Sequence, residues 1–360
     1  MPVNEFAARR DCFSNGFGRL RIDAALISGG ANLRYLSGFT GSNGMLLVLP
    51  GEAILFTDPR YQIQAAQETT CRVHVATGPL LAEVAAAIRR LGLRGIGYDP
   101  AHTTCEAFEA LHSRLPARCP LQSIAGRVEQ LRRVKSEEEI ALMRSAAATN
   151  SRAFEQATAK VRPGVREMDL AAELEYRMRR LGAEKAAFET IVAGGARSAL
   201  PHANPTAARL EAGDLVVVDM GAQQAGYASD MTRMLFLGSP GAKVKRLYRA
   251  VREAQSAALA AVRAGVTTAH VDGVARRVLR GFGLEKAFVH STGHGLGLEI
   301  HEVPRVGKRD RTRLEAGMAI TIEPGAYLKK FGKVRIEDTM MMTARGCEIL
   351  TPTGKNLRIV

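Results

Sequence analysis

Short apolar runs bounded by glycine or proline mark the first third of the chain. Residues 24–27, 45–49 and 53–56 are runs of this kind, and each predicts a strand. Residues 79–91 instead carry apolar side chains at the spacing of a helix face, so we expect a helix there. This mixture of strands and helices predicts a small α/β domain over residues 1–130.

Longer amphipathic segments follow from residue 131 onwards. Ser136 and Glu139 have the spacing of a capping box, which predicts that a helix begins there and runs to about residue 160. Strands and further helices complete a second, larger domain of residues 131–360. Its other helices are expected at residues 166–181, 240–263 and 268–280.

This second domain repeats its own plan. Residues 161–165 resemble residues 262–266, and residues 182–186 resemble residues 283–287, both at an offset of 101 positions. Self-similarity at a fixed offset indicates two copies of one structural unit. We therefore predict a pseudo-twofold internal repeat.

Each half of the repeat places two acids in matching positions. An apolar run leads into Asp219, and another leads into Glu323, 104 positions later. Asp230 and Glu337 follow these first acids by 11 and 14 positions. Because such spacings suit neighbouring strands of hairpins, we expect an α+β domain whose antiparallel sheet brings the four acids together.

Four clustered carboxylates require positive charge close by. Like charges in a pocket raise one another's pKa, whereas divalent cations neutralise them. His294, which stands between two glycines that let the backbone approach an ion, adds an imidazole. The oxygen-rich set exceeds what one ion needs and predicts two divalent ions sharing bridging carboxylates, held by Asp219, Asp230, His294, Glu323 and Glu337.

Other histidines fall near these motifs. An isolated histidine is more often a hydrogen-bonded core residue than a functional one. Four of the eight histidines, however, lie at positions 202, 290, 294 and 301. We therefore expect His202, His290 and His301 to belong to the same site.

Composition narrows the classes of function. The 360 residues carry a formal net charge of +14, but the basic residues are mixed with glutamate and accompany no nucleic-acid-binding motif, so specific nucleic-acid binding is not expected. Five scattered cysteines show neither metal-finger nor redox spacing. The chain has no run of about 18 apolar residues and no signal-peptide core, so we expect a cytoplasmic protein without a membrane partner.

Together these motifs resemble the Xaa-Pro peptidases, the aminopeptidase P and prolidase branch of the pita-bread metallopeptidases. In the first domain, residues 32–41 and 57–61 resemble the creatinase-type N-terminal domain. The resemblance implies a pita-bread catalytic domain preceded by a smaller creatinase-type α/β domain. In the second domain it is carried by Leu200-Pro201-His202, Val218-Asp219-Met220-Gly221, Ser229-Asp230, Gly293-His294-Gly295, His301-Glu302, Glu323-Pro324-Gly325 and Arg335-Ile336-Glu337-Asp338.

The same resemblance implies a role for each candidate ligand. Asp219 would hold one ion, and Asp230 and Glu337 would bridge both. His294 and Glu323 would hold the other. A hydroxide that bridges the ions would attack the amide carbon before proline, with Glu323 as the proton acceptor.

Substrate contacts are implied in the same way. His202 and His301 would act in catalysis by stabilising the substrate carbonyl and the tetrahedral intermediate. His290 would line the proline pocket, and Arg305 would grasp a substrate carboxylate. Arg335, also expected beside the substrate, would orient an acid ligand.

The resemblance further implies the metal, the substrate class and the oligomer. Relatives commonly use Mn²⁺ and sometimes Co²⁺ or Zn²⁺, act on small proline-containing peptides, and form homodimers. One departure is visible: residues 328–333 include three lysines where the family usually has a Pro-Gly-x-Gly-Gly type of loop.

Several activities remain open. Residues 38–41 and 58–61 favour an Xaa-Pro aminopeptidase, and an Xaa-Pro dipeptidase (prolidase) is the alternative because Arg305 would seat the free carboxylate of proline. Methionine aminopeptidases share the five-ligand plan but not the first domain or Leu200-Pro201-His202. Creatinase-like and non-catalytic peptide-binding relatives usually lose ligands, and this chain keeps all five.

Overall fold

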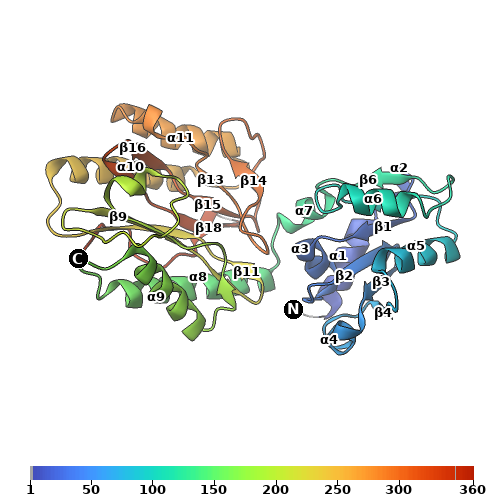
Figure 1. The fold of residues 1–360 in the computed structure, drawn as a ribbon. Helices are drawn as coiled ribbons and strands as arrows, with labels where there is room; N and C mark the ends of the chain where they lie inside the picture. The colour runs from blue at the N-terminus through green and yellow to red at the C-terminus, as the bar shows by residue number, and fades with distance from the viewer. Residues whose placement is uncertain (1–2, 345) are drawn as a thin grey trace. The chain divides into compact units, whose positions relative to one another are not determined.

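The structure, a computed structural model, describes residues 3–344 and 346–360 (Figure 1). The chain divides into two compact units, Met1–Arg132 and Arg133–Val360, each with its own sheets and core. In the described ranges, no helix is both long and apolar enough to cross a membrane.

The first unit is built on a mixed six-stranded sheet in the order β4-β3-β2-β1-β5-β6. Strand β2 pairs antiparallel with β1 and β3, whereas the outer pairs are parallel. The predicted strands and helix of this unit are confirmed as β1, β2, β3 and α5. Its elements are α1 (Val3–Ser14), α2 (Phe17–Leu20), β1 (Ala24–Ile27), α3 (Gly30–Ser37), β2 (Gly44–Leu49), β3 (Glu52–Thr57), α4 (Gln62–Glu68), β4 (Arg72–Val75), α5 (Leu80–Arg90), β5 (Ile96–Tyr98), α6 (Cys105–His112), β6 (Leu121–Ser123) and α7 (Arg127–Arg132).

The second unit begins with the predicted capping box. Ser136 Oγ accepts the backbone N–H of Glu139 at 3.3 Å, and the Glu139 carboxylate accepts the N–H of Ser136 at 2.9 Å. The four predicted helices are confirmed, each within a few residues of its expected ends. They are α8 (Glu137–Thr158), α9 (Glu167–Arg180), α10 (Ala242–Ala261) and α11 (Thr268–Gly281).

Two larger sheets form the centre of this unit, in the orders β20-β12-β9-β8 and β14-β13-β15-β18-β19. Apart from the parallel β12–β20 pair, their strands pair antiparallel, as predicted. Two smaller sheets are β11-β10-β7 and the β16–β17 hairpin. The strands are β7 (Lys185–Ala186), β8 (Ile191–Ala193), β9 (Leu215–Met220), β10 (Ala222–Gln224), β11 (Tyr227–Ala228), β12 (Met231–Phe236), β13 (Gly293–Gly295), β14 (Glu302–Val306), β15 (Ala319–Ile322), β16 (Gly325–Leu328), β17 (Gly332–Arg335), β18 (Asp338–Thr343), β19 (Gly346–Ile349) and β20 (Arg358–Ile359).

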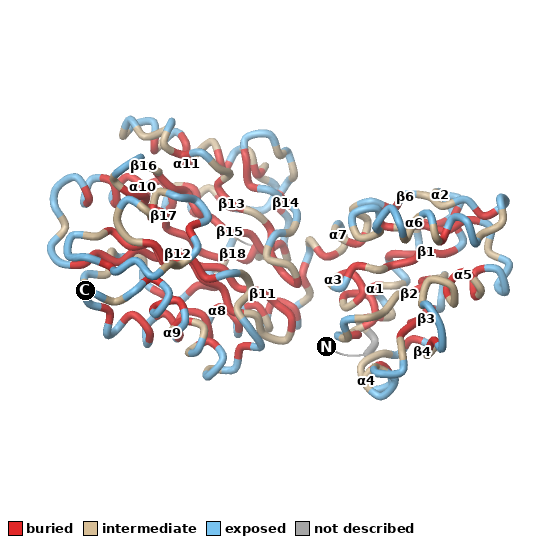
Figure 2. The backbone as a smooth tube through the Cα atoms, viewed as in Figure 1, coloured by how far each residue is buried: buried red, intermediate tan, exposed pale blue. Residues whose placement is uncertain are grey.

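Helices cover the central strands on both sides. In Figure 1, α8 and α9 lie below the strands and α10 and α11 above them. Along β9, Val216 and Val218 pack in the core between the strands and helices α8 and α9. Leu215 and Val217 pack in the core on the side of α10 and α11. Because successive strand residues point to opposite faces, this continuous apolar run buries both faces, and Figure 2 shows the central strands buried.

The internal repeat is visible in the backbone hydrogen bonds. Gly164 N donates to Leu210 O at 2.8 Å, and Gly265 N donates to Leu314 O at the same distance. The offsets between these partners are the 101 and 104 positions seen in the sequence. The pair α8–α9 with β9 therefore corresponds to the pair α10–α11 with β15.

Candidate metal centre

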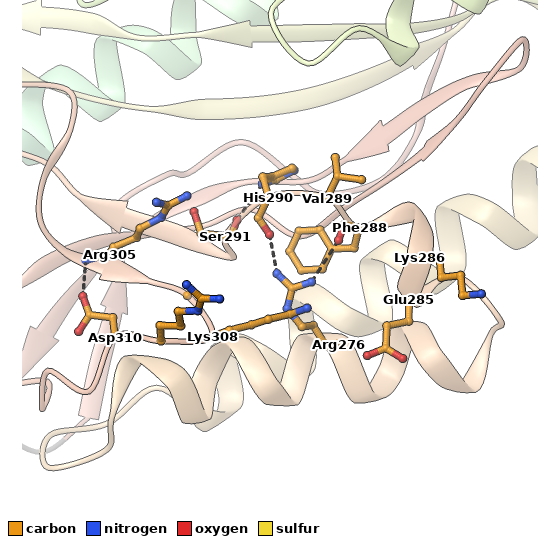
Figure 3. A pocket seen from close by; sticks show the side chains of 12 residues that line it. Arg276, Glu285, Lys286, Phe288, Val289, His290, Ser291, Arg305, Lys308 and Asp310 are labelled. Carbon is orange, nitrogen blue, oxygen red and sulfur yellow. Dashed lines mark hydrogen bonds between the residues drawn. The ribbon is translucent and has the colours of Figure 1, made fainter.

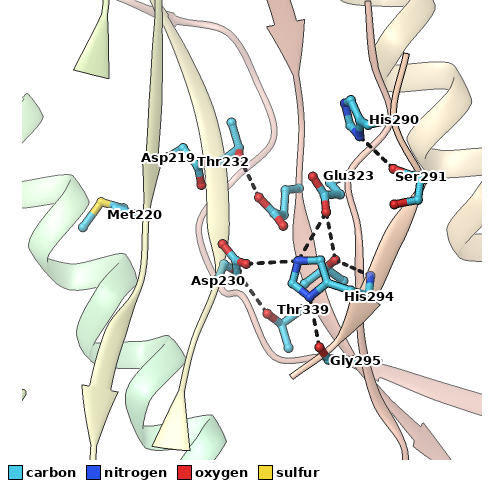
Figure 4. A network of polar contacts seen from close by, with 12 residues as sticks. Asp219, Met220, Asp230, Thr232, His290, Ser291, His294, Gly295, Glu323 and Thr339 are labelled. Carbon is cyan, nitrogen blue, oxygen red and sulfur yellow. Dashed lines mark hydrogen bonds and ion pairs between the residues drawn. The ribbon is translucent and has the colours of Figure 1, made fainter. Parts of the chain in front are cut away.

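The four acids of the repeat lie at the ends of paired strands. Asp219 is near the end of β9, and Asp230 directly precedes its antiparallel partner β12. Glu323 directly follows β15, and Glu337 directly precedes its partner β18. All four are buried, with 2% to 8% of their surface exposed. The two hairpin-related pairs thus present their carboxylates inside the protein, as Figure 4 shows for three of them.

His294 completes the cluster from β13. Its Nε2 lies 3.6 Å from Asp230 Oδ2 and 3.4 Å from Glu323 Oε1. Single ligand atoms of Asp230, His294 and Glu337 all lie within 4.8 Å of one another. The other ring nitrogen of His294, Nδ1, is 3.0 Å from the carbonyl of Gly295. Because a carbonyl oxygen can only accept a hydrogen bond, Nδ1 carries the proton. The lone pair of Nε2 therefore faces the acids, as metal binding requires.

Arg335 and Thr232 tie three of the acids together. The Arg335 guanidinium forms an ion pair with Asp219 and lies 3.9 Å from Glu323 Oε2. Its Nε donates to Thr232 Oγ1 at 3.0 Å, and that hydroxyl donates to Glu337 at 2.6 Å. Arg335 is buried and contacts the acids directly, so it holds them in place.

Burial makes this arrangement electrostatically costly without added positive charge. Burial, followed by the charges of neighbouring acids, raises the pKa of Asp230 and of Glu337 well above the usual range. Burial raises the pKa of Glu323 to about 7 and lowers that of His294. Each group is pushed toward its neutral form, which divalent cations would reverse.

The donor set fits divalent metal ions. Asp219 Oδ1 and Asp230 Oδ1 are buried and have no hydrogen-bond partner among the described residues. A buried carboxylate oxygen without a partner is costly, and an ion would satisfy it. Carboxylate oxygens with one imidazole are typical ligands of Mn²⁺ and related ions.

His202 and His301 are exposed to solvent. The ring of His301 is 4.4 Å from that of His294, centroid to centroid. Burial lowers the pKa of His301, and the nearby imidazoles of His294 and His202 lower it further. His301 thus contacts the cluster through His294, and His202 lies near enough to His301 to affect its charge.

His290 lies in the wall beside the cluster. Its Nδ1 donates to the carbonyl of Ser291 at 2.7 Å, so its Nε2 accepts from Tyr327 Oη at 2.8 Å. Burial lowers its pKa to about 3. With both nitrogens engaged and the ring neutral, His290 offers the face of its ring and no proton-transfer atom.

A cavity of about 670 Å³ opens next to His290. Arg305 lines it with an exposed side chain, and its backbone N–H donates to Asp310 at 3.0 Å (Figure 3). The neighbouring Arg276 is instead held by an ion pair with Asp272 and by hydrogen bonds to the backbone carbonyls of Phe288 and His290. Within the described ranges, the guanidinium of Arg305 makes no ion pair, so it can accept an anionic group.

Sequence reasoning missed several residues of this network: Thr232, Thr321, Tyr327 and Lys333. Thr321 accepts the N–H of His294 at 3.1 Å and lies 3.3 Å from Glu323. A polar threonine inside an apolar strand, two positions before a candidate ligand, was the available signal. Lys333 is fully buried, and burial lowers its pKa to about 7.

Comparison with known proteins identifies the family. Residues 141–344 match the model of metallopeptidase family M24. The chain belongs to this family. Residues 9–134 of this M24 chain match the creatinase/prolidase N-terminal domain. The predicted pita-bread domain and creatinase-type domain are thereby confirmed, and the chain is a metallopeptidase that uses divalent metal ions.

Similar M24 proteins span nearly the whole chain. An Xaa-Pro dipeptidase of Pyrococcus horikoshii is 38% identical over 336 residues, which cover 93% of this chain and 94% of that protein. The solved Xaa-Pro dipeptidase from Bacillus anthracis is 36% identical with a TM-score of 0.96, covering 99% of this chain and 100% of that one. The solved X-Pro aminopeptidase from Thermotoga maritima is 38% identical with a TM-score of 0.90, covering 95% and 99%.

Proposed function

We propose that this chain is an Xaa-Pro dipeptidase. The sequence motifs placed the aminopeptidase first, but the relatives favour the dipeptidase alternative. The structural observation that supports the proposal is the exposed guanidinium of Arg305, which lines the same cavity as His290. A dipeptide ending in proline presents a carboxylate at the point where Arg305 would bind it.

Asp219, Asp230, His294, Glu323 and Glu337 are proposed to hold two divalent cations, with Mn²⁺ as the expected metal. Asp230 and Glu337 are the proposed bridging ligands because their ligand atoms lie close to each other and to His294. When bound, the cations supply Lewis acidity that polarises a carbonyl and makes a water molecule more acidic.

Residues around the ions complete the proposed chemistry. Glu323 accepts a proton from the attacking water and passes it to the proline nitrogen. His301 and His202 donate hydrogen bonds to the substrate carbonyl oxygen as negative charge develops on it. Arg335 keeps Asp219 and Glu323 oriented through its ion pairs.

The proline side of the substrate is proposed to lie against His290. Its ring is held at right angles to Tyr327 and to Phe288, with centroid distances of 5.3 Å and 5.0 Å. A neutral ring without available polar atoms suits the apolar pyrrolidine ring. Because the amide before proline has no N–H, the site binds it by shape and needs no acceptor for that group.

Arg305→Ala is expected to impair a dipeptide more than a longer peptide. Loss of the guanidinium removes a bidentate contact with the proline carboxylate of Ala-Pro, worth about 2 kcal/mol, so kcat/KM should fall roughly 30-fold. In Ala-Pro-Ala-Ala that carboxylate is an amide, and the loss should stay within about threefold.

Initial rates on both peptides test this, with Arg309→Ala as the matched control. Arg309 is an exposed arginine that lines the same cavity. Equal losses on the two peptides would show that Arg305 does not bind the carboxylate.

His202→Ala is expected to reduce kcat by about 10²-fold and to leave metal content near that of the wild type, because its imidazole stabilises charge that appears only in the transition state. Metal content is measured by atomic emission and kcat on Ala-Pro. The control is His270→Ala, an exposed histidine of α11. An unchanged kcat would remove His202 from catalysis.

A second candidate function is the Xaa-Pro aminopeptidase, favoured by the similarity to the Thermotoga maritima structure. The two are separated by rates of the Mn²⁺-loaded protein on Ala-Pro, Ala-Pro-Ala-Ala and Ala-Ala. Fast cleavage of Ala-Pro alone supports the dipeptidase, and preference for Ala-Pro-Ala-Ala supports the aminopeptidase. We further propose a homodimer, and a monomer on gel filtration would contradict it.

A further inference from the structure

Lys333 in β17 has none of its surface exposed. In the part of the chain that the structure describes, it forms no ion pair with a carboxylate. Its ammonium donates instead to two backbone carbonyls, those of Leu200 and Pro201, each at 3.1 Å. A buried ammonium is costly unless its protons are bound, so these two contacts fix the lysine and the backbone it holds.

The segment that Lys333 binds leads directly into His202. A further contact strengthens the attachment, because Lys333 N donates to Ser198 Oγ at 3.1 Å and that hydroxyl donates to the carbonyl of Gly195 at 2.7 Å. At the preceding Gly332, an added Cβ would stand 2.7 Å from Ser198 Oγ. The hairpin strand and the segment 195–201 are therefore packed as closely as a glycine allows.

Lys333 also borders the other parts of the site. Its ammonium lies 5.4 Å from the ring centroid of Tyr327, whose hydroxyl contacts His290. Two residues farther along the same strand, Arg335 holds Asp219. One side chain thus connects the strand of the metal site with the segment that carries His202.

We propose that Lys333 is a positioning residue, which holds the backbone of Leu200 and Pro201 so that His202 stays directed at the substrate carbonyl. The inference rests on the proposed function, in which His202 stabilises developing charge. His202 itself is exposed, so its orientation depends on the backbone that precedes it. Lys333 does not touch the substrate and acts through that backbone.

The first test is hydrogen exchange of the metal-loaded protein without substrate, comparing wild type with Lys333→Met. Methionine fills a similar volume but donates no hydrogen bond. Amides of residues 197–203 should exchange about tenfold faster in Lys333→Met, while those of β9 stay unchanged. Lys329→Met, at an exposed lysine of the same hairpin turn, is the control. Unchanged exchange in residues 197–203 would overturn the proposal.

The second test is a double-mutant cycle on Ala-Pro. Lys333→Met should lower kcat about tenfold with a smaller change in KM, and Lys333→Gln, which keeps donor protons, should restore part of the loss. In a His202→Ala background the same substitution should lower kcat by less than about twofold, because the lysine acts through that histidine. Losses that multiply would show that Lys333 does not act through His202.

The two tests separate the proposal from the function on which it rests. Failure of the wild type to cleave any Xaa-Pro peptide would refute the proposed function, and exchange would still decide whether Lys333 holds the segment. A variant too unstable to measure is replaced by Lys333→Gln, for which the same exchange and kinetic differences are expected at about half the size on a logarithmic scale.

Discussion

Glu337→Ala should remove both the bound metal and the peptidase activity. Glu337 is buried among three other acids, with only 2% of its surface exposed. One of its carboxylate oxygens lies close to ligand atoms of Asp230 and His294. Loss of a bridging ligand weakens both cation sites at once, so activity on Ala-Pro should fall by about 10³-fold or more. Metal content by atomic emission and kcat/KM on Ala-Pro are the measurements.

Asp230→Ala should behave in the same way, because it is the other proposed bridge. The matched control is Glu348→Ala, which removes a glutamate of β19 that pairs with Arg144 at the surface and should change stability by less than about 1 kcal/mol. A Glu337→Ala protein that retains two metal ions and full activity would disprove the bridging role.

Glu323→Gln should reduce kcat by about 10³-fold or more, because the amide cannot accept a proton and binds a cation more weakly. In contrast to Glu337→Ala, it keeps the size of the side chain. A pH profile of kcat/KM and a metal determination are the measurements. Activity within tenfold of the wild type would exclude Glu323 as the proton acceptor.

The same variant tests the electrostatics of the metal-free protein. Burial raises the pKa of Glu323 from 4.5 to about 7, so between these values the folded protein binds a proton that the unfolded chain has lost. Stability therefore falls as pH rises through that window. Buried histidines such as His290, whose pKa is lowered, have the opposite effect on stability below pH 6.5. The contribution of Glu323 is therefore measured as the difference in stability between wild type and Glu323→Gln.

Without metal, the free energy of unfolding of Glu323→Gln should rise relative to that of the wild type by on the order of 2 kcal/mol between pH 4.5 and 7. This corresponds to roughly 4–8 °C in Tm. Thermal unfolding in a chelator at several pH values measures this gain. Saturating Mn²⁺ should abolish the trend in the wild type, because cations then neutralise the carboxylate. A constant difference across the window would show that Glu323 is ionised in the metal-free fold.

The strongest sequence predictions came from features that act locally or recur. The capping box at Ser136 set the start of α8, and the repeat placed Asp219 and Glu323 at equivalent strand ends. Both signals depend on neighbouring residues or on duplication, so no tertiary information was needed. The family resemblance then supplied the N-terminal domain and the reaction class.

Other elements depend on tertiary contacts that no local pattern reveals. Helix α1 has as many polar as apolar side chains and is held by contacts such as that of Arg9 with the carbonyl of Tyr35 at 3.1 Å. Strand β13 has three residues, two of them glycine, and forms because β14 and β15 pair with it. Propensity disfavours such a strand, and pairing overrides it.

Polar partners of the site were missed for a related reason. Thr232 lies opposite Asp219 in the β9–β12 register, and a shift of one residue would turn it to the other face. The contacts of Lys333 with Leu200 and Pro201 join positions more than 130 residues apart. Register and long-range approach are properties of the folded chain, so the sequence indicated the candidate ligands and left their supporting contacts unseen.

The most direct test of the account is a titration of the metal-free protein with Mn²⁺, in which bound metal and the initial rate on Ala-Pro are measured on the same samples. We expect no hydrolysis in the chelated protein and a rate that rises until two ions are bound per chain. Full hydrolysis without metal, or two bound ions without cleavage of Ala-Pro, would contradict the proposed metal-dependent Xaa-Pro dipeptidase.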